Sequence, residues 1–462
     1  MKILFEQHKA FLALLLLALL LRIAYLIIAL NIGKEAAFTQ PDTESYLRPA
    51  RLFLETGGFV YADGIPETRR TPGLPIFLAV MIALFGAKYY LGAAILQIVF
   101  NLLAITSLYA LTLKLTNRPK TALIVAFLAA FALNDIVYAN ALMSDSLAQS
   151  HMAFMLYFYG RFMLAIERRF EWMAFVAGSL ALLAMIFLRP AFLYLPFALL
   201  LGFALFLWAK KQPRGILPAA GVIVLIAILP TTLWTLRNEA LGGVRQFSTM
   251  SSYYLNDSVS VIYAKTHGIH FYEAQPIVSG GHGEDLQPYL AIMPKPDAYR
   301  KRAIEMIKSD PLTYAKAYLA RIPCLFFYPE INDALRFAPV FSTLIAEFKA
   351  AFIAQSLAPI NHPGLSVAYL AAASLNTLAL VVLFVLAACG LLVPGGVMRG
   401  SSVLRSACSV MLPCLHACQW AMVPIRASGW ESVCRSFFSP RWALPICMPV
   451  LWRAGGNSHS YR

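Results

Sequence analysis

Acidic and basic side chains occur at several places beside apolar segments of this sequence. Asp42, Arg69 and Arg70 belong to one polar stretch, residues 34–74, which follows the first apolar run. Asp145 lies in ALMSDSLAQSH, between two later apolar runs. A carboxylate can take a proton from a hydroxyl group, and a guanidinium fork binds phosphate and stabilises charge developing on it. These residue types therefore predict chemistry in which a hydroxyl group attacks and a phosphate leaves.

Two further arginines, Arg189 and Arg237, stand at the ends of apolar runs. They add to a predicted phosphate-binding set of Arg69, Arg70, Arg189 and Arg237. Structural explanations compete with this reading. Asp42 and Asp145 each precede a helix-like segment and suit an N-cap, and terminal arginines can extend toward the membrane surface or form structural ion pairs.

The composition indicates a membrane protein. Of the 462 residues, 60% are hydrophobic and 13% are charged. The net charge of +15 comes largely from short basic clusters between apolar runs, a pattern that orients membrane proteins, so no nucleic-acid partner is predicted. Five of the 7 cysteines follow residue 400, which leaves Cys324 and Cys389 and predicts no disulfide framework.

Apolar runs of the required length predict about eight membrane spans. The first run is too long for a signal peptide and lacks a small-residue cleavage site, so we expect it to be retained. A shorter run at 74–86 predicts a helix on the outer surface. The predicted spans are 11–30, 91–113, 120–140, 146–166, 172–188, 191–209, 215–234 and 366–393.

The basic clusters predict the orientation of these spans. Lysine and arginine precede the first span and follow the second, fourth and sixth, so those ends are expected in the cytoplasm together with the N-terminus. The first loop, 31–90, then lies outside. The Asp145 turn, the Arg189–Pro190 turn and the segment 237–365 share that side. All predicted site residues therefore converge on one face.

The chain divides into four predicted regions: a transmembrane module at 1–234, an α-rich or mixed outer domain at 235–365, a last span at 366–393 and an atypical tail at 394–462. In the outer domain, 295–322 predicts helix with a break at Pro311, and 340–355 predicts an amphipathic surface helix. The tail has no lysine and one acidic residue, Glu431, which indicates a shifted reading frame.

Metal and nucleotide motifs are not found in the sequence. It contains no GxGxxG, Walker loop or HExxH. His267, His270 and the Gly-rich GGHGED at 280–285 are interpreted as loop residues, and we predict no metal or cofactor.

Four stretches resemble the C-type (GT-C) integral-membrane glycosyltransferases, in particular bacterial relatives of dolichyl-phosphate-mannose-protein mannosyltransferases and of the lipid A aminoarabinose transferase. They are PDTESY (41–46), RRTPGLPIFLAVMIALFG (69–86), LMSDSLAQ (142–149) and WTLRN (234–238) with the later QFST (246–249). Leu74 stands where the family usually has Tyr, and Asp145 where it commonly has Glu.

The resemblance implies an all-α polytopic enzyme of the bacterial inner membrane, with its active site on the periplasmic face. It would transfer a sugar from a polyprenyl-phosphate donor to a lipid, glycan or protein acceptor. Asp42 would be the general base, Asp145 a second acidic site residue, and Arg70 a contact to the donor phosphate. The resemblance assigns a phosphate-binding role to Arg189 and Arg237 less directly.

Two other functions fit the same composition. An O-antigen ligase or polymerase also combines many spans with a large outer loop, but its functional loop is not expected directly after the first span. A lipid-linked sugar flippase or other transporter would place polar residues within the spans and show an internal repeat. We find no repeat, and the sequence predicts almost purely apolar span interiors.

Overall fold

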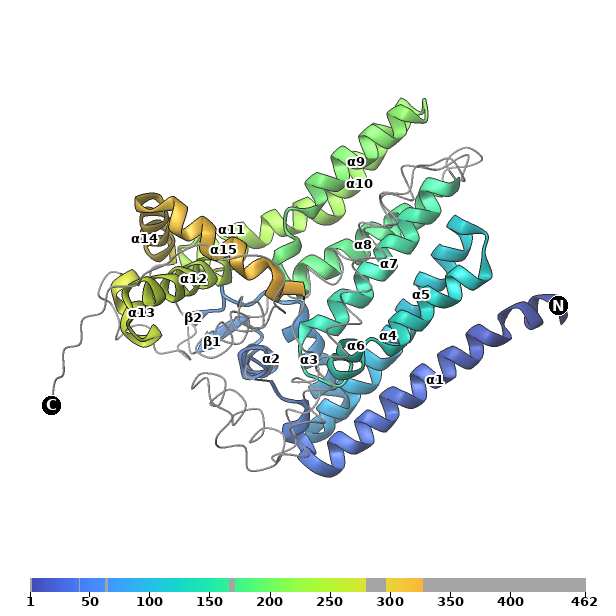
Figure 1. Ribbon diagram of the computed structural model, residues 1–462, viewed down its shortest axis with the longest axis horizontal. Helices are drawn as coiled ribbons and strands as arrows, with labels where there is room; N and C mark the ends of the chain where they lie inside the picture. The colour runs from blue at the N-terminus through green and yellow to red at the C-terminus, as the bar shows by residue number, and fades with distance from the viewer. Residues whose placement is uncertain (1, 41, 63–64, 166–170, 280–295, 327–462) are drawn as a thin grey trace, which may run out of the picture.

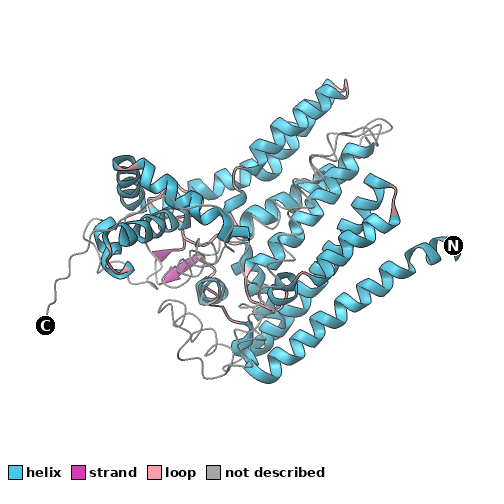
Figure 2. Ribbon diagram, viewed as in Figure 1, coloured by secondary structure: helices cyan, strands magenta, loops and turns pink. Residues whose placement is uncertain are grey.

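The computed structural model describes residues 2–40, 42–62, 65–165, 171–279 and 296–326. Helices dominate this part, and one short strand pair lies among them (Figure 2). The strands β1 (Val60–Ala62) and β2 (Ile65–Pro66) pair antiparallel within the first loop. The predicted last span at 366–393, the surface helix at 340–355 and the tail lie outside the described residues.

The helices fall into a large group from the first part of the chain and a smaller group from residues 250–326 (Figure 1). The α-helices of the first group are α1 (Lys2–Gly33), α2 (Glu44–Thr56), α3 (Gly73–Phe85), α4 (Tyr89–Thr116), α5 (Pro119–Phe131), α6 (Leu133–Tyr138), α7 (Ser144–Ala165), α8 (Trp172–Leu188), α9 (Leu195–Ala209), α10 (Ile216–Ile223) and α11 (Leu229–Gly242). Short connecting helices are η1 (Lys34–Phe38), η2 (Gly86–Lys88), η3 (Pro190–Phe192), η4 (Pro213–Gly215) and the π-helical η5 (Val224–Ile228).

Four helical stretches of the described residues are long and apolar enough to cross a membrane: His8–Phe38, Gly73–Thr116, Pro190–Ala209 and Pro213–Gly242. The chain is therefore a helical membrane protein by length and composition. The predicted count of eight spans is not reproduced. The run 120–140 divides at Ala132 into the 13-residue α5 and the short α6, and α8 has 17 residues. The run 146–166 forms α7, whose first turn carries serines and Asp145.

The predicted short helix at 74–86 is present as α3, and a turn separates it from α4. Gly86 has φ 54°, which ends α3 and lets the chain fold back, so that α3 packs against α4 and also against α2 and α8. α3 therefore brings the polar turn before it against the ends of the longer helices.

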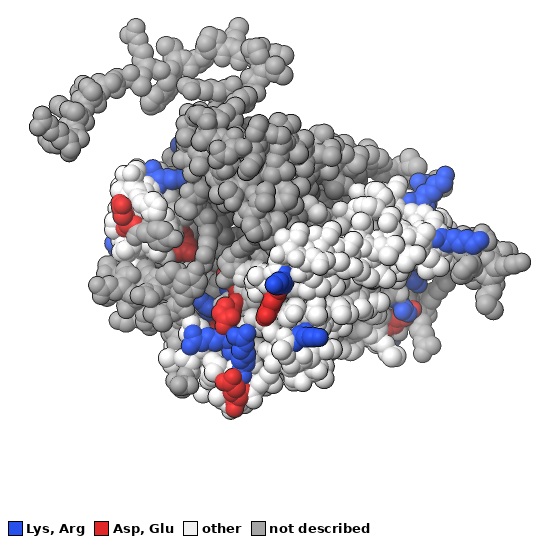
Figure 3. Space-filling view, turned by 90° about the horizontal axis from the view of Figure 1, so that it is seen from below, with Lys and Arg blue, Asp and Glu red and all other residues white. Residues whose placement is uncertain are grey.

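The main body packs around α7, which lies along α4 and α8. Its core is apolar and includes Phe162, Phe175, Leu182 and Met185. The pair formed by α9 and α10 diverges from this body (Figure 1), and many of its leucines are exposed, including Leu201 and Leu217. Figure 3 shows a broad uncharged surface on one face of the molecule, as expected for contact with lipid.

One polar network interrupts the apolar interior, which corrects the expectation of purely apolar spans. Arg22 of α1 is fully buried and donates to the side chain of Asn101 in α4 at 2.7 Å and to the backbone carbonyl of Ala130 at 3.1 Å. Asp135 lies within electrostatic range of Arg22. The sequence did not predict a polar network here, because a single arginine leaves the mean hydropathy of a long apolar run high.

The second group contains α12 (Met250–His267), α13 (Phe271–Ser279), α14 (Pro296–Ser309) and α15 (Pro311–Phe326). A small core of its own holds them together: Val259, Ile262, Val278, Ala303 and Tyr314. The predicted helices of 295–322 and their break at Pro311 are confirmed. In Figure 1 the N-terminal part of this group adjoins the strands β1 and β2.

Candidate active site

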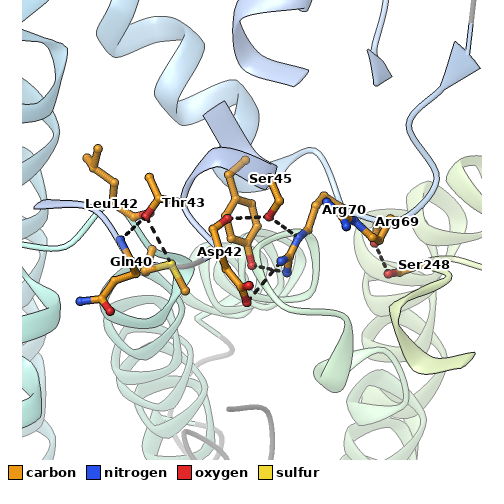
Figure 4. Close-up of polar contacts among 10 residues, drawn as sticks. Gln40, Asp42, Thr43, Ser45, Arg69, Arg70, Leu142 and Ser248 are labelled. Carbon is orange, nitrogen blue, oxygen red and sulfur yellow. Dashed lines mark hydrogen bonds and ion pairs between the residues drawn. The ribbon is translucent and has the colours of Figure 1, made fainter. Parts of the chain in front are cut away.

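The first part of the site is an ion pair between Asp42 and Arg70. The guanidinium Nη2 lies 3.3 Å from the Asp42 carboxylate. Arg70 also donates from Nε to the Ser45 hydroxyl at 2.9 Å and from Nη1 to the Tyr46 hydroxyl at 2.8 Å (Figure 4). All three nitrogens of Arg70 are thus engaged. Burial alone would lower the pKa of Arg70, but nearby Tyr46 and Asp42 raise it, so the guanidinium stays charged.

The helix that follows Asp42 is present as α2, and the N-cap function proposed for Asp42 is not observed. Thr43 occupies the N-cap position, and the carboxylate of Asp42 faces Arg70 instead. The first half of α2, which packs against α3, buries Tyr46, Leu47 and Ala50. Phe53 and Leu54, nearer its C-terminal end, are exposed.

Hydrogen bonds to the loop before α7 hold Asp42 in place. Gln40 donates its backbone N–H to the Thr43 hydroxyl at 2.8 Å, and Thr43 in turn donates to the carbonyl of Leu142 at 3.3 Å. The backbone N–H of Leu142 donates to the carbonyl of Phe38 at 2.8 Å. The segment around Asp42 is therefore fixed to the segment that leads directly to Asp145.

The second part of the site is an ion pair between Asp145 and Arg189. Nη1 of Arg189 donates to the Asp145 carboxylate, and both side chains are about one-tenth exposed. Arg189 is extended, with φ −141° and ψ 112°, between α8 and η3. The proline that follows, Pro190, disfavours helical geometry at the residue before it, so α8 ends at Leu188 and Arg189 leaves the helix. The predicted Arg189–Pro190 turn is confirmed.

A close backbone approach brings the Arg70 turn to Arg189. A Cβ added at Gly73, the first residue of α3, would lie 2.5 Å from the backbone oxygen of Phe187 and 2.8 Å from the nitrogen of Leu188. Only glycine fits there without displacing the end of α8. The TPG sequence after Arg70 therefore sets the spacing between the two arginine-bearing turns.

Two tyrosines connect the ion pairs. Tyr46 places its ring under the Arg70 guanidinium, 4.2 Å from its carbon, and interacts electrostatically with Arg189. Tyr254 of α12 lies within electrostatic range of Asp42, Arg70 and Arg189. The structure thus brings Asp42, Arg70, Asp145 and Arg189 into one cluster. Nothing in the sequence marks Tyr254, because it belongs to no motif and reaches the cluster only through the packing of α12.

Glu67 shapes the turn that carries Arg70. Its buried carboxylate accepts the backbone N–H groups of Arg69 at 2.6 Å and Arg70 at 2.9 Å. Its second oxygen is buried without a hydrogen bond to any described residue. Burial raises the pKa of Glu67, and the nearby Arg69 opposes that change. In the sequence, Glu67 resembles an ordinary surface acid in a polar loop, so no pattern indicates its burial.

The residues just before the second helix group form hydrogen bonds to the turn that carries Arg70. Ser248 donates its hydroxyl to the carbonyl of Arg69 at 2.5 Å (Figure 4), and Thr249 donates its N–H to the carbonyl of Thr68 at 3.1 Å. These two residues belong to the QFST stretch and directly precede α12. Arg70 is therefore held between Asp42 on one side and the residues before α12 on the other.

The other two predicted phosphate ligands lie beside this cluster. Arg237 donates to the carbonyls of Glu67 at 2.7 Å and Phe59 at 2.6 Å, and its guanidinium lies 4.9 Å from the centre of the Trp234 ring. These contacts fasten the end of α11 to the first loop. Arg69 interacts electrostatically with Asp42, but its Nε is buried without a described hydrogen-bond partner.

In the described ranges, no three His, Cys, Asp or Glu side chains come together as a metal-binding group. His267 stacks on Tyr263 with 3.9 Å between ring centres, and GGHGED lies outside these ranges. Comparisons with protein-family models, with curated proteins and with solved structures found no match.

Proposed function

We propose that this protein is a membrane glycosyltransferase that moves a sugar from a polyprenyl-phosphate donor to a hydroxyl group of a lipid, glycan or protein acceptor. The observation that carries the proposal is the pairing of two acids with two arginines in one buried cluster, Asp42 with Arg70 and Asp145 with Arg189. The resemblance of four stretches to GT-C enzymes supports the same reading. The finer features of that family, including eight spans and a site on the periplasmic face of a bacterial inner membrane, belong to this proposal.

In the proposed reaction, Asp42 accepts the proton of the acceptor hydroxyl. The hydroxyl oxygen forms a bond to the anomeric carbon of the sugar, and the bond from that carbon to the phosphate oxygen breaks. The electron pair of the broken bond leaves with polyprenyl phosphate. Asp42 suits the role of base because its side chain is 23% exposed, more than that of Asp145, so an acceptor can reach it.

The two arginines have different roles in this proposal. Arg70 uses each of its nitrogens on Asp42, Ser45 and Tyr46, so it positions the base. Arg189 uses only Nη1, on Asp145, and its Nε and Nη2 make no hydrogen bond to described residues. Two adjacent guanidinium donors suit two phosphate oxygens, which makes Arg189 the principal phosphate ligand.

Asp145 fits a supporting role. Its contact with Nη1 fixes the guanidinium plane of Arg189, and its negative charge offsets the cost of burying that arginine. Arg69 and Arg237 do not contact the phosphate in this proposal. Arg237 holds the first loop in place through its hydrogen bond to the Glu67 carbonyl, and Arg69 adds positive potential near Asp42.

Transfer of a radiolabelled sugar from polyprenyl-phosphate donors tests the proposal. Membranes carrying the full chain would be compared with membranes carrying Asp42→Asn, which keeps the size of the side chain but removes the base. We expect transfer by the parent and a loss of about 10²-fold or more in the variant. Glu44→Gln is the matched control, because Glu44 lies two residues after Asp42 at the start of α2, is 68% exposed and pairs with Arg51. Equal transfer by all three proteins would contradict the role of Asp42.

The buried network around Arg22 favours a second candidate, a transporter of lipid-linked sugars. Polar and charged groups within a span often mark a transport pathway, and Arg22 contacts two other helices there. Proteoliposomes with a fluorescent lipid-linked sugar would distinguish the two functions. Movement of the probe between leaflets without any sugar transfer would favour the transporter.

A further inference from the structure

Tyr254 is the residue of the second helix group that reaches the ion-pair cluster. It lies in the second turn of α12, five residues after Thr249, whose N–H is bonded to the Arg70 turn. Its phenol interacts electrostatically with Arg70 and Asp42 of one pair and with Arg189 of the other. The side chain is thus near enough to both pairs to interact with their charges.

The hydroxyl of Tyr254 differs from that of Tyr46 in its bonding. The Tyr46 hydroxyl accepts from Arg70 at 2.8 Å. The Tyr254 hydroxyl makes no hydrogen bond to any described residue, although the side chain is mostly buried. The hydroxyl is not among the fully buried polar atoms that lack a partner in the described residues, so it is open to a bound ligand oxygen that could accept its hydrogen bond.

The charge balance of the cluster favours a neutral donor at this point. Each arginine is already paired with an acid, so the four charged side chains sum to zero. A phosphate entering the cluster needs hydrogen-bond donors beyond the two nitrogens left on Arg189. Burial raises the pKa of the Tyr254 phenol, so it keeps its proton and acts as a donor throughout the physiological pH range.

We propose that Tyr254 binds the phosphate of the lipid-linked donor, so that α12 supplies a hydrogen bond to the same group as Arg189. This inference rests on the proposed glycosyltransferase function and adds a phosphate ligand from outside the four stretches that resemble GT-C enzymes. It also assigns a role to the second helix group, which would complete the donor site that the membrane helices begin.

Binding of polyprenyl phosphate, the product of the proposed reaction, tests the inference without relying on catalysis. The full-length protein in detergent would be titrated with this lipid, comparing the parent with Tyr254→Phe. Loss of one hydrogen bond to a charged group predicts about tenfold weaker binding. Tyr263→Phe is the matched control, since Tyr263 is on the same helix and stacks on His267, away from the ion pairs. Melting temperatures of all three would show that they fold alike.

A kinetic comparison separates the inference from the function on which it rests. In a transfer assay, Tyr254→Phe should raise the KM for the donor about tenfold and leave kcat and the KM for the acceptor nearly unchanged. Equal lipid affinity of parent and Tyr254→Phe would overturn the inference. A parent that binds the lipid but transfers no sugar would overturn the proposed function alone, and the binding comparison would still decide the role of Tyr254.

Discussion

Asp145 and Arg189 lie 44 positions apart in the chain and form a direct ion pair in which each side chain is only 10% exposed. Asp145 lies in the first turn of α7 and Arg189 directly follows α8, and these two helices pack along each other. A buried pair of this kind keeps each charge tolerable only while the other is present.

Removal of one partner should therefore destabilise the protein more than removal of both. Arg189→Met leaves Asp145 as an uncompensated buried charge and should cost about 3–5 kcal/mol. The double variant Asp145→Leu/Arg189→Met should recover much of that loss. Thermal unfolding in detergent would measure both, with Arg161→Met as the control, since Arg161 belongs to a more exposed pair with Glu171. Additive losses in the double variant would show that the pair is not coupled.

Gly73→Ala should damage the site from a position that carries no chemistry. The new methyl group would meet the backbone of Phe187 and Leu188, which cannot yield as a side chain can. We expect a loss of about 1–3 kcal/mol in stability and lower transfer activity, because the Arg70 turn would move away from Arg189. Gly202→Ala is the control. Gly202 lies inside α9 with nothing near its Cβ position, so alanine should be neutral or stabilise by about 0.5–1 kcal/mol. Equal melting temperatures for the two variants would refute the close-approach explanation.

Glu67 should make stability fall as pH rises. Burial raises its pKa above the ordinary value of 4.5, so the folded protein retains a proton that the unfolded chain has released. The contribution of this group is then greatest below about pH 4.5 and is lost as pH rises through the higher pKa of the folded state. Glu67→Gln should remove this slope while keeping an oxygen for the N–H groups of Arg69 and Arg70. Unfolding measured from pH 4 to 8, with the exposed Glu55→Gln as reference, would check it. A slope that persists unchanged in Glu67→Gln would exclude Glu67 as its source.

Arg22 should be a structural residue of the helix bundle if the protein is an enzyme. Arg22→Met removes the bonds to Asn101 and to the Ala130 carbonyl and leaves Asp135 without its neighbouring cation. We expect reduced stability, by about 3–5 kcal/mol, with the KM for the donor unchanged. Melting temperature and transfer kinetics of the purified variant would test this. An intact melting temperature together with lost movement of lipid across vesicles would instead favour the transporter.

The sequence predicted several local features of the chain. The Asp42 and Asp145 segments, the Arg189–Pro190 turn and the Pro311 break follow from short-range rules about prolines and apolar periodicity. The partners of these residues do not. Nothing near Asp145 in the chain indicates Arg189, because their contact depends on how α7 and α8 pack. Arg22, Glu67 and Tyr254 were missed for the same reason: each acquires its environment from segments far away in sequence.

The span count could not be predicted from hydropathy alone. The run 120–140 is apolar enough to cross a membrane, yet the chain bends at Ala132 and leaves two shorter helices. That bend places Asn134 and Asp135 in the interior near Arg22. Local hydropathy does not contain this information, since the bend is stabilised by contacts with another helix.

The hydrogen bonds from Ser248 and Thr249 to the Arg70 turn also determine when the site can be completed during synthesis of the protein. Translation proceeds from the N-terminus, so the loop with Asp42 and Arg70 is made and inserted well before residues 248–254 exist. Until that later segment arrives, the turn lacks two of its hydrogen bonds and Tyr254 is absent. A ribosome-bound chain shorter than this would therefore hold an open, incomplete centre, and the protein would become competent only after its second helix group has begun to fold.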